Sequence, residues 1–364
     1  MAKLGDYVKI RTGKLDANAS SESGQYPFFT CAIEPLKIDS YSYDCECVLV
    51  AGNGDLNVKY YSGKFDAYQR TYIIESMDKT FLDVQYLYFF MDKYLETLRS
   101  QSIGGVIKYI KLGNLTEADI FIPSIERQRK IVQILRKSRK LISLRKQQLA
   151  KLDELVKARF VVMFGDPVSN PKHWKTAFLL DIGYCKNGMN FHKGDSGVDI
   201  HCLGVGDFKN RTMIQNVEDL PFVSLNELPD PEYLLRDNDI IFVRSNGNKE
   251  LVGRCLAIYP GSIPVTYSGF CIRYRLTSTN IDTPYLLQVL KTDSIRKKMT
   301  GRGANIQNLN QQTLSQLLVP IPPLSLQNEF AAFVERVDQQ KQTIQQSLEK
   351  LELMKKVLMQ EYFG

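Results

Sequence analysis

Apolar residues recur every three or four positions through two long polar segments of this chain. In the first segment they are Ile131, Ile134, Leu135, Leu141, Ile142, Leu149, Leu152, Leu155, Val156 and Val162, and in the second Phe330, Phe333, Val334, Val337, Ile344, Leu348, Leu351, Met354 and Leu358. This spacing holds for about five heptads and predicts a helix of roughly 50 Å in each segment. We expect the two apolar stripes to pack on each other as a coiled coil. It would be imperfect, because Ser138, Arg145, Gln340 and Ser347 fall at core positions.

Shorter runs rich in Val, Ile, Tyr and Phe precede each long segment and predict strands. Examples are residues 47–51, 72–75, 240–244, 254–259 and 270–276. Asn53-Gly54 and Asn246-Gly247 indicate turns after two of them. A short helix (84–99 and 284–299), a glycine-containing loop (101–108 and 300–308) and a short apolar run (120–122 and 317–319) follow in each half. Prolines then separate each mixed region from its long helix. The sequence therefore predicts an α+β fold.

The order of elements is repeated because part of the chain is duplicated. Residues 86–165 align without a gap with residues 285–364 at a constant offset of 199. Shared positions include Tyr86/Tyr285, Gly104/Gly303, Pro123/Pro322, Gln128/Gln327, Lys157/Lys356 and the closing pairs Phe164-Gly165/Phe363-Gly364. A repeat of about 80 residues is a duplicated domain with its helix, not a solenoid unit. We expect a first domain at 1–123, a helix at 124–165, a second domain at 166–322 and a helix at 323–364.

The link between the first helix and the second domain decides how the helices pack. Residues 166–174 are too few to return along a helix of roughly 50 Å, at about 3.3–3.6 Å per extended residue. Antiparallel packing is therefore expected, with the two domains at opposite ends and an approximate two-fold axis between them.

The bulk composition is that of a globular protein outside the membrane and secretory classes. The chain has 364 residues, and no apolar stretch approaches the length of a membrane span. Its first residues lack the apolar core of a secretory signal. The seven cysteines are scattered, which suits reduced thiols better than disulfides. We expect a cytoplasmic protein of two domains.

The charge is concentrated on one helix. The net charge is +7, yet residues 126–160 alone hold twelve basic and three acidic residues, and residues 325–363 hold five basic and six acidic ones. Two interpretations stay open. The bases are a solvated face paired with acids of the other helix, or they contact a DNA backbone or an acidic protein surface. Contact with a DNA backbone or an acidic protein surface is favoured, because the acidic residues of the other helix are too few to neutralise so many basic side chains.

Two unlike domains separated by about 50 Å suit a long, regular polymer. That distance is about 15 base pairs of duplex DNA, and domains inverted about a two-fold axis match the strand symmetry of DNA. We therefore expect a split, asymmetric recognition sequence with an unread spacer set by the helices.

Several motifs resemble the specificity subunit of type I restriction-modification systems, over the full chain. They are Leu4-Gly5-Asp6 followed by Gly13, Ile122-Pro123-Ser124-Ile125-Glu126-Arg127-Gln128, Ile321-Pro322-Pro323-Leu324-Ser325-Leu326-Gln327, Phe164-Gly165-Asp166-Pro167, Ile241-Phe242-Val243-Arg244-Ser245-Asn246-Gly247 and Gly301-Arg302-Gly303. The first copy departs from the family's double proline at Ser124.

The resemblance implies two target recognition domains and a pair of spacer helices that dock two methyltransferase subunits, which a separate motor/nuclease subunit can join. The chain itself would be non-catalytic and would bind no cofactor. S-adenosylmethionine, ATP and Mg²⁺ would belong to its partners. The substrate of the complex would be double-stranded DNA, methylated on adenine.

Candidate DNA-binding residues are loop side chains that can bond to base edges, Arg and Lys to guanine and Asn and Gln to adenine. In the first domain they are Arg11, Lys14, Asn53, Lys59, Lys64, Arg70 and Lys108, and in the second Lys186, Arg211, Arg244, Asn246, Asn248, Lys249, Arg302, Asn305 and Gln307. Tyr60, Tyr61 and Tyr68 are candidates for phosphate contacts. The glycine-containing loops are the strongest candidates as groups, since they recur at the same place in both copies.

Other functions find less support in the sequence. The chain lacks the tetrapeptide of amino-methyltransferases and a phosphate-binding P-loop. Cys45-x-Cys47 lies in an expected strand, where a core pair is favoured over a metal site. The three histidines have no catalytic partner at motif spacing. The main alternative is a coiled-coil scaffold whose domains bind protein rather than DNA.

Overall fold

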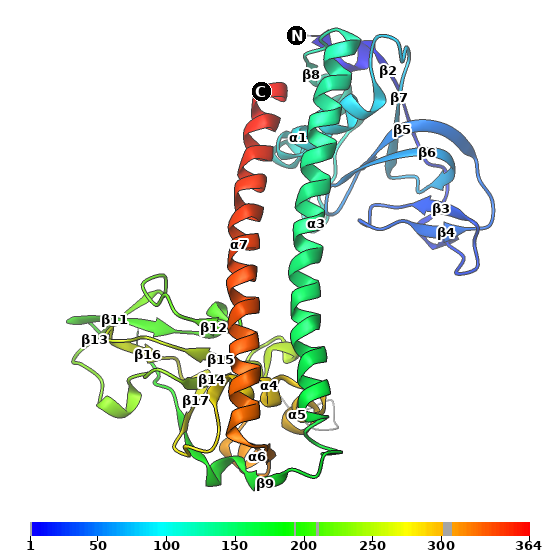
Figure 1. The fold of residues 1–364 in the computed structure, drawn as a ribbon. Coiled ribbons are helices and arrows are strands. Elements are labelled where there is room, and N and C mark those ends of the chain that lie inside the picture. Colours follow the sequence, from blue (N-terminus) through cyan, green and yellow to red (C-terminus); the bar gives the residue numbers. More distant parts are fainter. Residues whose placement is uncertain (1, 193, 209–210, 301–307) are drawn as a thin grey trace. The chain divides into compact units, whose positions relative to one another are not determined.

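The computed structural model describes residues 2–192, 194–208, 211–300 and 308–364. The chain divides into two compact units, Met1–Gln147 with Ile344–Gly364, and Gln148–Thr343. Two helices of 40 residues, α3 (Ile125–Phe164) and α7 (Leu324–Phe363), each contribute one half to each unit (Figure 1).

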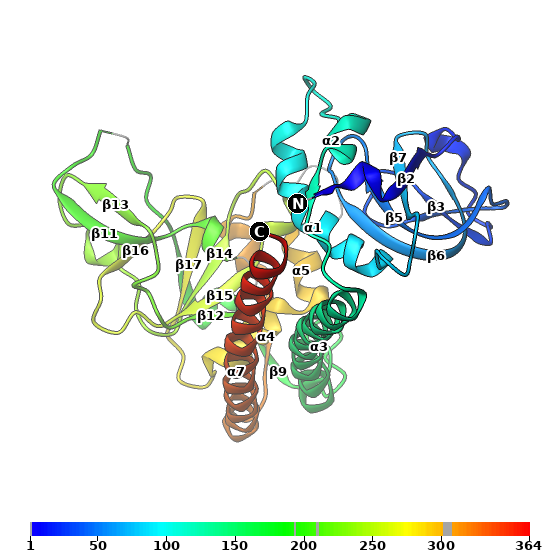
Figure 2. The same ribbon diagram turned by 90° about the horizontal axis from the view of Figure 1, so that it is seen from above.

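The first unit is built on a six-stranded sheet. The strand order is β2-β7-β5-β6-β3-β4, and all neighbours are antiparallel except β3 and β6. Figure 2 labels β2, β3, β5, β6 and β7 of this sheet. Its strands are β2 (Val8–Thr12), β3 (Tyr26–Phe29), β4 (Leu36–Ile38), β5 (Tyr43–Ala51), β6 (Val58–Ala67) and β7 (Thr71–Ser76), and β1 (Ala2–Lys3) pairs with β8 (Asp119–Ile120). Helices α1 (Val84–Gln101) and α2 (Leu112–Thr116) complete the unit.

Strand β5 is buried on both faces because each face has its own core. Val48 and Val50 point into the larger cluster, which includes Tyr86 of α1, Leu135 of α3 and Met359 of α7. The alternate residues of β5 pack in a second cluster, whose members include Cys47, Leu49, Phe65 and Ile73. The period of two along a strand assigns these residues to opposite faces. The sheet is thereby tied to both long helices through α1.

The second unit has a five-stranded sheet of order β10-β17-β14-β15-β12, a three-stranded sheet of order β13-β11-β16 and the pair β18-β9. The strands are β9 (Lys175–Phe178), β10 (Gly183–Asn187), β11 (Val198–Leu203), β12 (Met213–Ile214), β13 (Phe222–Leu225), β14 (Asp239–Val243), β15 (Cys255–Ile258), β16 (Val265–Tyr267), β17 (Cys271–Leu276) and β18 (Leu318–Ile321). The expected single helix at 284–299 is two, α4 (Thr283–Lys291) and α5 (Asp293–Thr300), because Thr292 is extended at φ −62° and ψ 145°. Helix α6 (Gln311–Ser315) follows.

The long helices run antiparallel within each unit, as the sequence predicts. In the first unit Lys146 of α3 is paired with Glu352 of α7 at 2.8 Å. In the second unit Asp153 is paired with Lys341 at 2.7 Å, and Arg159 with Glu329 at 2.8 Å. As the residue number rises along α3, the number of its partner on α7 falls, so the two helices are antiparallel.

Each long helix ends against the domain of the other copy. In the first unit the Tyr86 hydroxyl donates to the Phe121 carbonyl at 2.7 Å, and its ring lies 5.1 Å from that of Phe363. In the second unit Tyr285 donates to the Pro320 carbonyl at 2.9 Å, and its ring lies 4.7 Å from that of Phe164. The repeated Phe-Gly pairs are thus the ends of α3 and α7. Each end packs on the tyrosine of the other copy of the repeat.

A buried glutamine fastens the start of each long helix. Gln128 accepts from the Asp83 amide at 2.9 Å and donates to the Phe81 and Pro123 carbonyls, both at 2.8 Å. Gln327 accepts from the Asp282 amide at 2.9 Å and donates to the Asn280 and Pro322 carbonyls at 3.0 and 2.8 Å. Both side chains are wholly buried. The shared glutamine therefore joins the loop before the short helix to the proline before the long one, and the internal repeat is confirmed.

One expectation about the coiled coil is wrong. Ile134, Leu141, Leu155 and Val162 of α3 and Met354 of α7 are exposed rather than packed in the seam. The four residues of α3 are spaced by multiples of seven, so they form their own face, distinct from that of buried Leu135 and Phe160. Ser138 is buried at a core position, as expected, whereas Gln340 is exposed. Helix α3 thus carries a second, outward apolar stripe.

Replacing Gln128 by Ala should lower the free energy of unfolding by about 2–3 kcal/mol, because it leaves one amide and two carbonyls without partners in a buried place. Gln133→Ala, at an exposed position of the same helix, is the control and should change little. The measurement is chemical denaturation of the purified chain. Equal effects of the two substitutions would show that the buried network does not stabilise the helix start.

Candidate nucleic-acid interface

In the first unit, backbone hydrogen bonds hold several loops together at one end of the six-stranded sheet. Strands β2 and β5 end there and β7 begins there, since Thr12 pairs with Tyr72 and Ala51 with Thr71. The Gly13 amide donates to the Thr71 carbonyl at 3.1 Å, Gly52 to Arg70 at 2.8 Å and Gly54 to Lys108 at 2.9 Å. We call residues 13–15, 52–55, 68–70 and 103–109 the first loop end.

The second unit has the same frame at the end of its five-stranded sheet. The Gly188 amide donates to the Cys271 carbonyl at 3.1 Å, Arg244 to Phe270 at 2.8 Å, and Leu309 to Arg244 at 2.7 Å. We call residues 188–189, 244–248, 268–270 and 308–309 the second loop end. In this frame Phe270 takes the position that Arg70 has in the first unit.

A glycine permits the closest approach in each frame. A Cβ atom at Gly13 would lie 2.1 Å from the Ala67 carbonyl oxygen, and one at Gly188 would lie 2.1 Å from the Ser268 carbonyl oxygen. No side chain fits at such a distance. Glycine at both positions therefore has a steric cause.

The first loop end brings together four of the seven candidates of the first domain. They are Lys14, Asn53, Arg70 and Lys108. The carbonyls of Arg70 and Lys108 accept two of the hydrogen bonds above, Lys14 follows Gly13 directly, and Asn53 lies between Gly52 and Gly54.

The other three candidates lie on strands of the sheet and interact with neighbouring side chains. Arg11 is paired with Glu75 at 2.6 Å and lies over the Tyr43 ring. Lys59 donates to Asn57, and burial lowers the pKa of its ammonium group. Lys64 lies 4.6 Å above the Tyr41 ring.

Two of the tyrosines proposed for phosphate contacts are also engaged on β6. The Tyr60 hydroxyl donates to Glu46 at 2.8 Å, and Tyr61 donates to the Lys64 carbonyl at 3.3 Å. Tyr68 belongs to the first loop end, where its amide donates to the Phe29 carbonyl at 2.9 Å. Of the three, Tyr68 is the one that belongs to the first loop end.

At the second loop end, Arg244 and three neighbouring candidates follow β14. Arg244 donates to the Gly269 carbonyl at 3.3 Å. Asn246 accepts from the Asn248 amide at 2.8 Å, and Asn248 accepts from the Glu250 amide at 3.0 Å, which caps the short helix that begins at Lys249. The bond from the Asn248 amide to the Asn246 side chain makes an Asx-turn at the expected Asn246-Gly247 position, and a capped short helix follows it.

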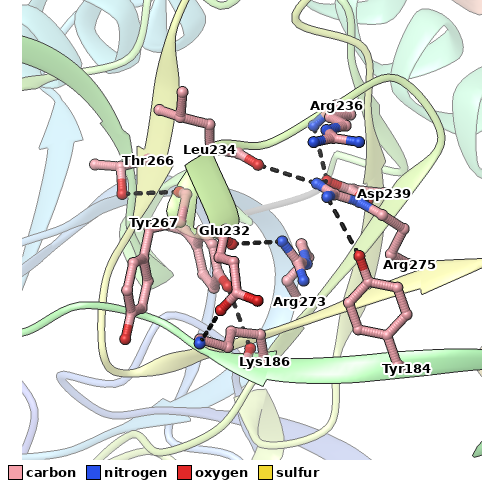
Figure 3. Close-up of polar contacts among 11 residues, drawn as sticks. Tyr184, Lys186, Glu232, Leu234, Arg236, Asp239, Thr266, Tyr267, Arg273 and Arg275 are labelled. Carbon is pink, nitrogen blue, oxygen red and sulfur yellow. Dashed lines mark hydrogen bonds and ion pairs between the residues drawn. The ribbon is translucent and has the colours of Figure 1, made fainter. Parts of the chain in front are cut away.

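The remaining candidates of the second domain lie elsewhere. Arg211 is exposed just before β12, an edge strand of the five-stranded sheet. Arg302, Asn305 and Gln307 lie outside the described residues. Lys186 lies in β10 within a network of charged side chains (Figure 3).

The network around Lys186 compensates a row of cations on one sheet face. Lys186 lies opposite Arg273 in the β10–β17 pair, and like charges so placed repel. Glu232 compensates for this, because its carboxylate is paired with Lys186 and its carbonyl accepts from Arg273 at 2.6 Å. Its hydrogen bond raises the pKa of Lys186.

Beyond these residues, Arg275 is held by both carboxylate oxygens of Asp239 at 2.7 Å, which raises the pKa of the guanidinium (Figure 3). The sequence analysis missed this network. The alternation of Arg273 and Arg275 along β17 is the signal that could have revealed it.

Phe270 is a second residue that the sequence analysis assigned only to a strand. Its side chain is 61% exposed at the second loop end, directly before β17. A large exposed aromatic beside Arg244 can stack on a base or a sugar, so Phe270 joins the candidates. The signal that could have located it is its place directly before a strand, which is also the place of the candidate Arg70.

Other types of site find no support in the part of the chain that the structure describes. No three or more His, Cys, Asp or Glu residues gather there as metal ligands would. None of the helices described is both long and apolar enough to span a membrane.

The family model of the type I restriction modification DNA specificity domain matches residues 1–154 and 171–353. The chain therefore belongs to the specificity subunits of type I restriction-modification systems, and each of its copies carries one DNA specificity domain.

Relatives and solved structures agree with this family. The chain is 26% identical to the type I restriction enzyme EcoDI specificity subunit of Escherichia coli, over 95% of this chain and 82% of that protein. Its fold is similar to that of a crystal structure of the type I restriction-modification S subunit from M. genitalium, with a TM-score of 0.64 at 17% identity, covering 100% of this chain and 95% of that one. A structure described as the basis of complex assembly and conformational transition of the type I R-M system has a TM-score of 0.57 at 13% identity, covering 100% and 96%.

Replacing Gly188 by Ala should lower the free energy of unfolding by at least about 2 kcal/mol, because the new Cβ forces β10 away from the loop at Ser268. Gly194→Ala is the matched control, since a Cβ there meets nothing within 4 Å. Chemical denaturation of both variants tests this. A Gly188→Ala protein as stable as the control would show that the loop frame tolerates displacement.

Proposed function

We propose that this chain reads a bipartite, asymmetric sequence of double-stranded DNA and docks methyltransferase subunits without catalysing a reaction itself. The observation that carries the proposal is the pair of loop ends. Both have the same backbone frame, but Arg70 in one corresponds to Phe270 in the other. Two loop ends with the same backbone hydrogen bonds but different side chains can recognise two different half-sites.

The side chains at each loop end supply the chemistry of base recognition. Asn53 and Lys108 in the first, and Arg244 and Asn246 in the second, can bond to base edges in the major groove. Lys14 and Arg70 add positive charge, which a phosphate backbone attracts. The candidates Arg302, Asn305 and Gln307 belong by sequence to the loop before Asn308 and stay predictions. The same holds for Lys186, Arg11, Lys59, Lys64, Arg211, Asn248 and Lys249.

The outward stripe of α3 supports docking of methyltransferase subunits. In the first unit Ile134, Leu141 and Leu144 of α3 and Leu353 and Val357 of α7 are exposed. Such aliphatic residues at helical spacing suit a partner that adds its own helices.

The duplication supports two docking places. Leu155 and Met354 occupy equivalent positions of the two copies, and both are exposed, each within its own unit. Two methyltransferase subunits are therefore expected. A motor/nuclease subunit would join through them, and S-adenosylmethionine, ATP and Mg²⁺ would bind to these partners.

The basic residues of α3 favour contact with a partner over the solvated-face interpretation. Arg139, Lys146 and Arg159 are paired with acids of the chain. In contrast, Arg127, Arg129, Lys130, Lys137 and Lys140 are exposed along the helix in the first unit. These five suit a DNA backbone or an acidic protein surface.

The proposed function is tested by sequencing the methylome of cells that produce the chain with its cognate methyltransferase. The expected result is methyladenine in one split, asymmetric motif, and selection from random duplexes with the purified complex should enrich the same motif. If neither experiment returns a motif, the alternative of a scaffold whose domains bind protein replaces the proposal.

The exposed apolar residues of α3 in the first unit give a separate prediction. Leu141→Asp with Leu144→Asp should reduce co-purification of the methyltransferase subunit at least tenfold, because charges would enter a desolvated interface. Gln147→Asp, exposed on the same helix, is the control for added charge. Undiminished recovery of the complex, with both variants folded, would place the docking surface elsewhere.

A further inference from the structure

The first loop end has an apolar tip that base-edge hydrogen bonding leaves unexplained. Val106 is fully exposed, and Ile107 is 62% exposed. Single exposed aliphatic residues are common on proteins. Val106 and Ile107 are two adjacent β-branched residues at the tip of a loop whose other residues suit DNA. We therefore expect these two side chains to contact a ligand.

The loop that carries this tip is held at its base. Ile103 and Tyr109 exchange amide–carbonyl hydrogen bonds of 3.0 and 2.8 Å, and the Ile110 amide donates to the Gly52 carbonyl at 2.9 Å. Gly104, at φ +117°, lies so close to the Ile107 carbonyl that a Cβ would be 2.5 Å from its oxygen. The tip is therefore a folded projection from a fixed base, and the β-branched side chains have few rotamers.

The surroundings of the tip are polar and cationic. Lys108 follows it directly, and the Lys108 carbonyl accepts from the Gly54 amide beside Asn53. Arg70 is joined to the same frame through Gly52. Asp55, the acid closest to Asn53 in sequence, is paired with Arg99 at 3.8 Å. A partner of the tip must therefore be anionic overall and yet offer small apolar groups.

Major-groove DNA has this combination, because the 5-methyl group of thymine is the apolar feature of its base edges. Valine and isoleucine carry no side-chain donor or acceptor, so they cannot discriminate guanine or cytosine by hydrogen bonds. Two side chains are also too few for a stable protein interface, which needs about 800 Å² per partner.

We propose that Val106 and Ile107 read thymine 5-methyl groups in the half-site bound by the first domain. Asn53 and Lys108 bond to neighbouring base edges, and the aliphatic tip contacts one or two methyl groups in the same groove. This inference rests on the proposed function, since it assigns a specificity-determining role to residues of the same loop end.

The test replaces each thymine of the first half-site by uracil, which removes the methyl group and keeps the base pairing. The site is taken from the methylome, and affinities are measured for the complex with its methyltransferase. With the wild-type chain, uracil at one or two positions should weaken binding about fivefold. In the double variant Val106→Ser, Ile107→Thr, thymine and uracil duplexes should bind alike at those positions.

Met77→Ser is the matched control, because Met77 is also an exposed apolar residue but follows β7 at the other end of the same sheet. It should keep the full thymine–uracil difference. Thermal unfolding of all variants checks that they are folded.

The inference is overturned if uracil weakens binding nowhere in the first half-site, or if the half-site has no A·T pair. It is also overturned if the double variant binds both duplexes more weakly but keeps the wild-type ratio between thymine and uracil affinities. Absence of any specific binding by the wild-type complex is a different outcome, which contradicts the proposed function itself.

Discussion

The structure depends on the exchange of helix ends between the two copies. Tyr86 packs on Phe363, and Tyr285 packs on Phe164, although each phenylalanine belongs by sequence to the other copy. Burial of aromatic rings contributes strongly to stability. The exchange also fixes the direction of the helices within each unit, because a helix whose last residue must reach the other domain has to run antiparallel to its mate. The ion pairs along the helices are exposed and contribute less.

The two loop ends share their backbone hydrogen bonds and differ in their side chains. Backbone amides and carbonyls make the frame, together with the close approach at Gly13 and Gly188. Because the frame is made of main-chain groups, the side chains that it presents are free to differ, as Arg70 and Phe270 do. A protein whose task is to discriminate base sequences benefits from such a division.

Much of the fold could be predicted from the sequence, because it is marked by short motifs that occur once in each copy of the repeat. The prolines before each long segment indicated where both helices begin, and the closing Phe-Gly pairs of the repeat indicated where they end. The outward stripe of α3 could not be separated from the seam, since Ile134 and Leu135 both fit a three-four spacing and only the packing of the mate decides between them. The break at Thr292 was missed because no proline or glycine marks it, although threonine is a residue that favours the position before a helix.

The candidate site was predictable to the level of loops rather than side chains. Lys14, Asn53, Arg70 and Lys108 come together because turns at one end of a sheet must meet. The engagement of Lys186 with Glu232 could not be foreseen, since 46 residues separate them and no motif joins them. Phe270 escaped notice because its aromatic character matched the strand that it precedes.

The first unit contains the last 21 residues of the chain, Ile344–Gly364, and its core includes Met359. During synthesis the amino-terminal domain must therefore wait for the final turns of α7 to leave the ribosome before its hydrophobic surface around Tyr86 is covered. A polypeptide released early keeps that surface open to chaperones and proteases. Folding of the domain made first thus depends on a helix that is made after the second domain.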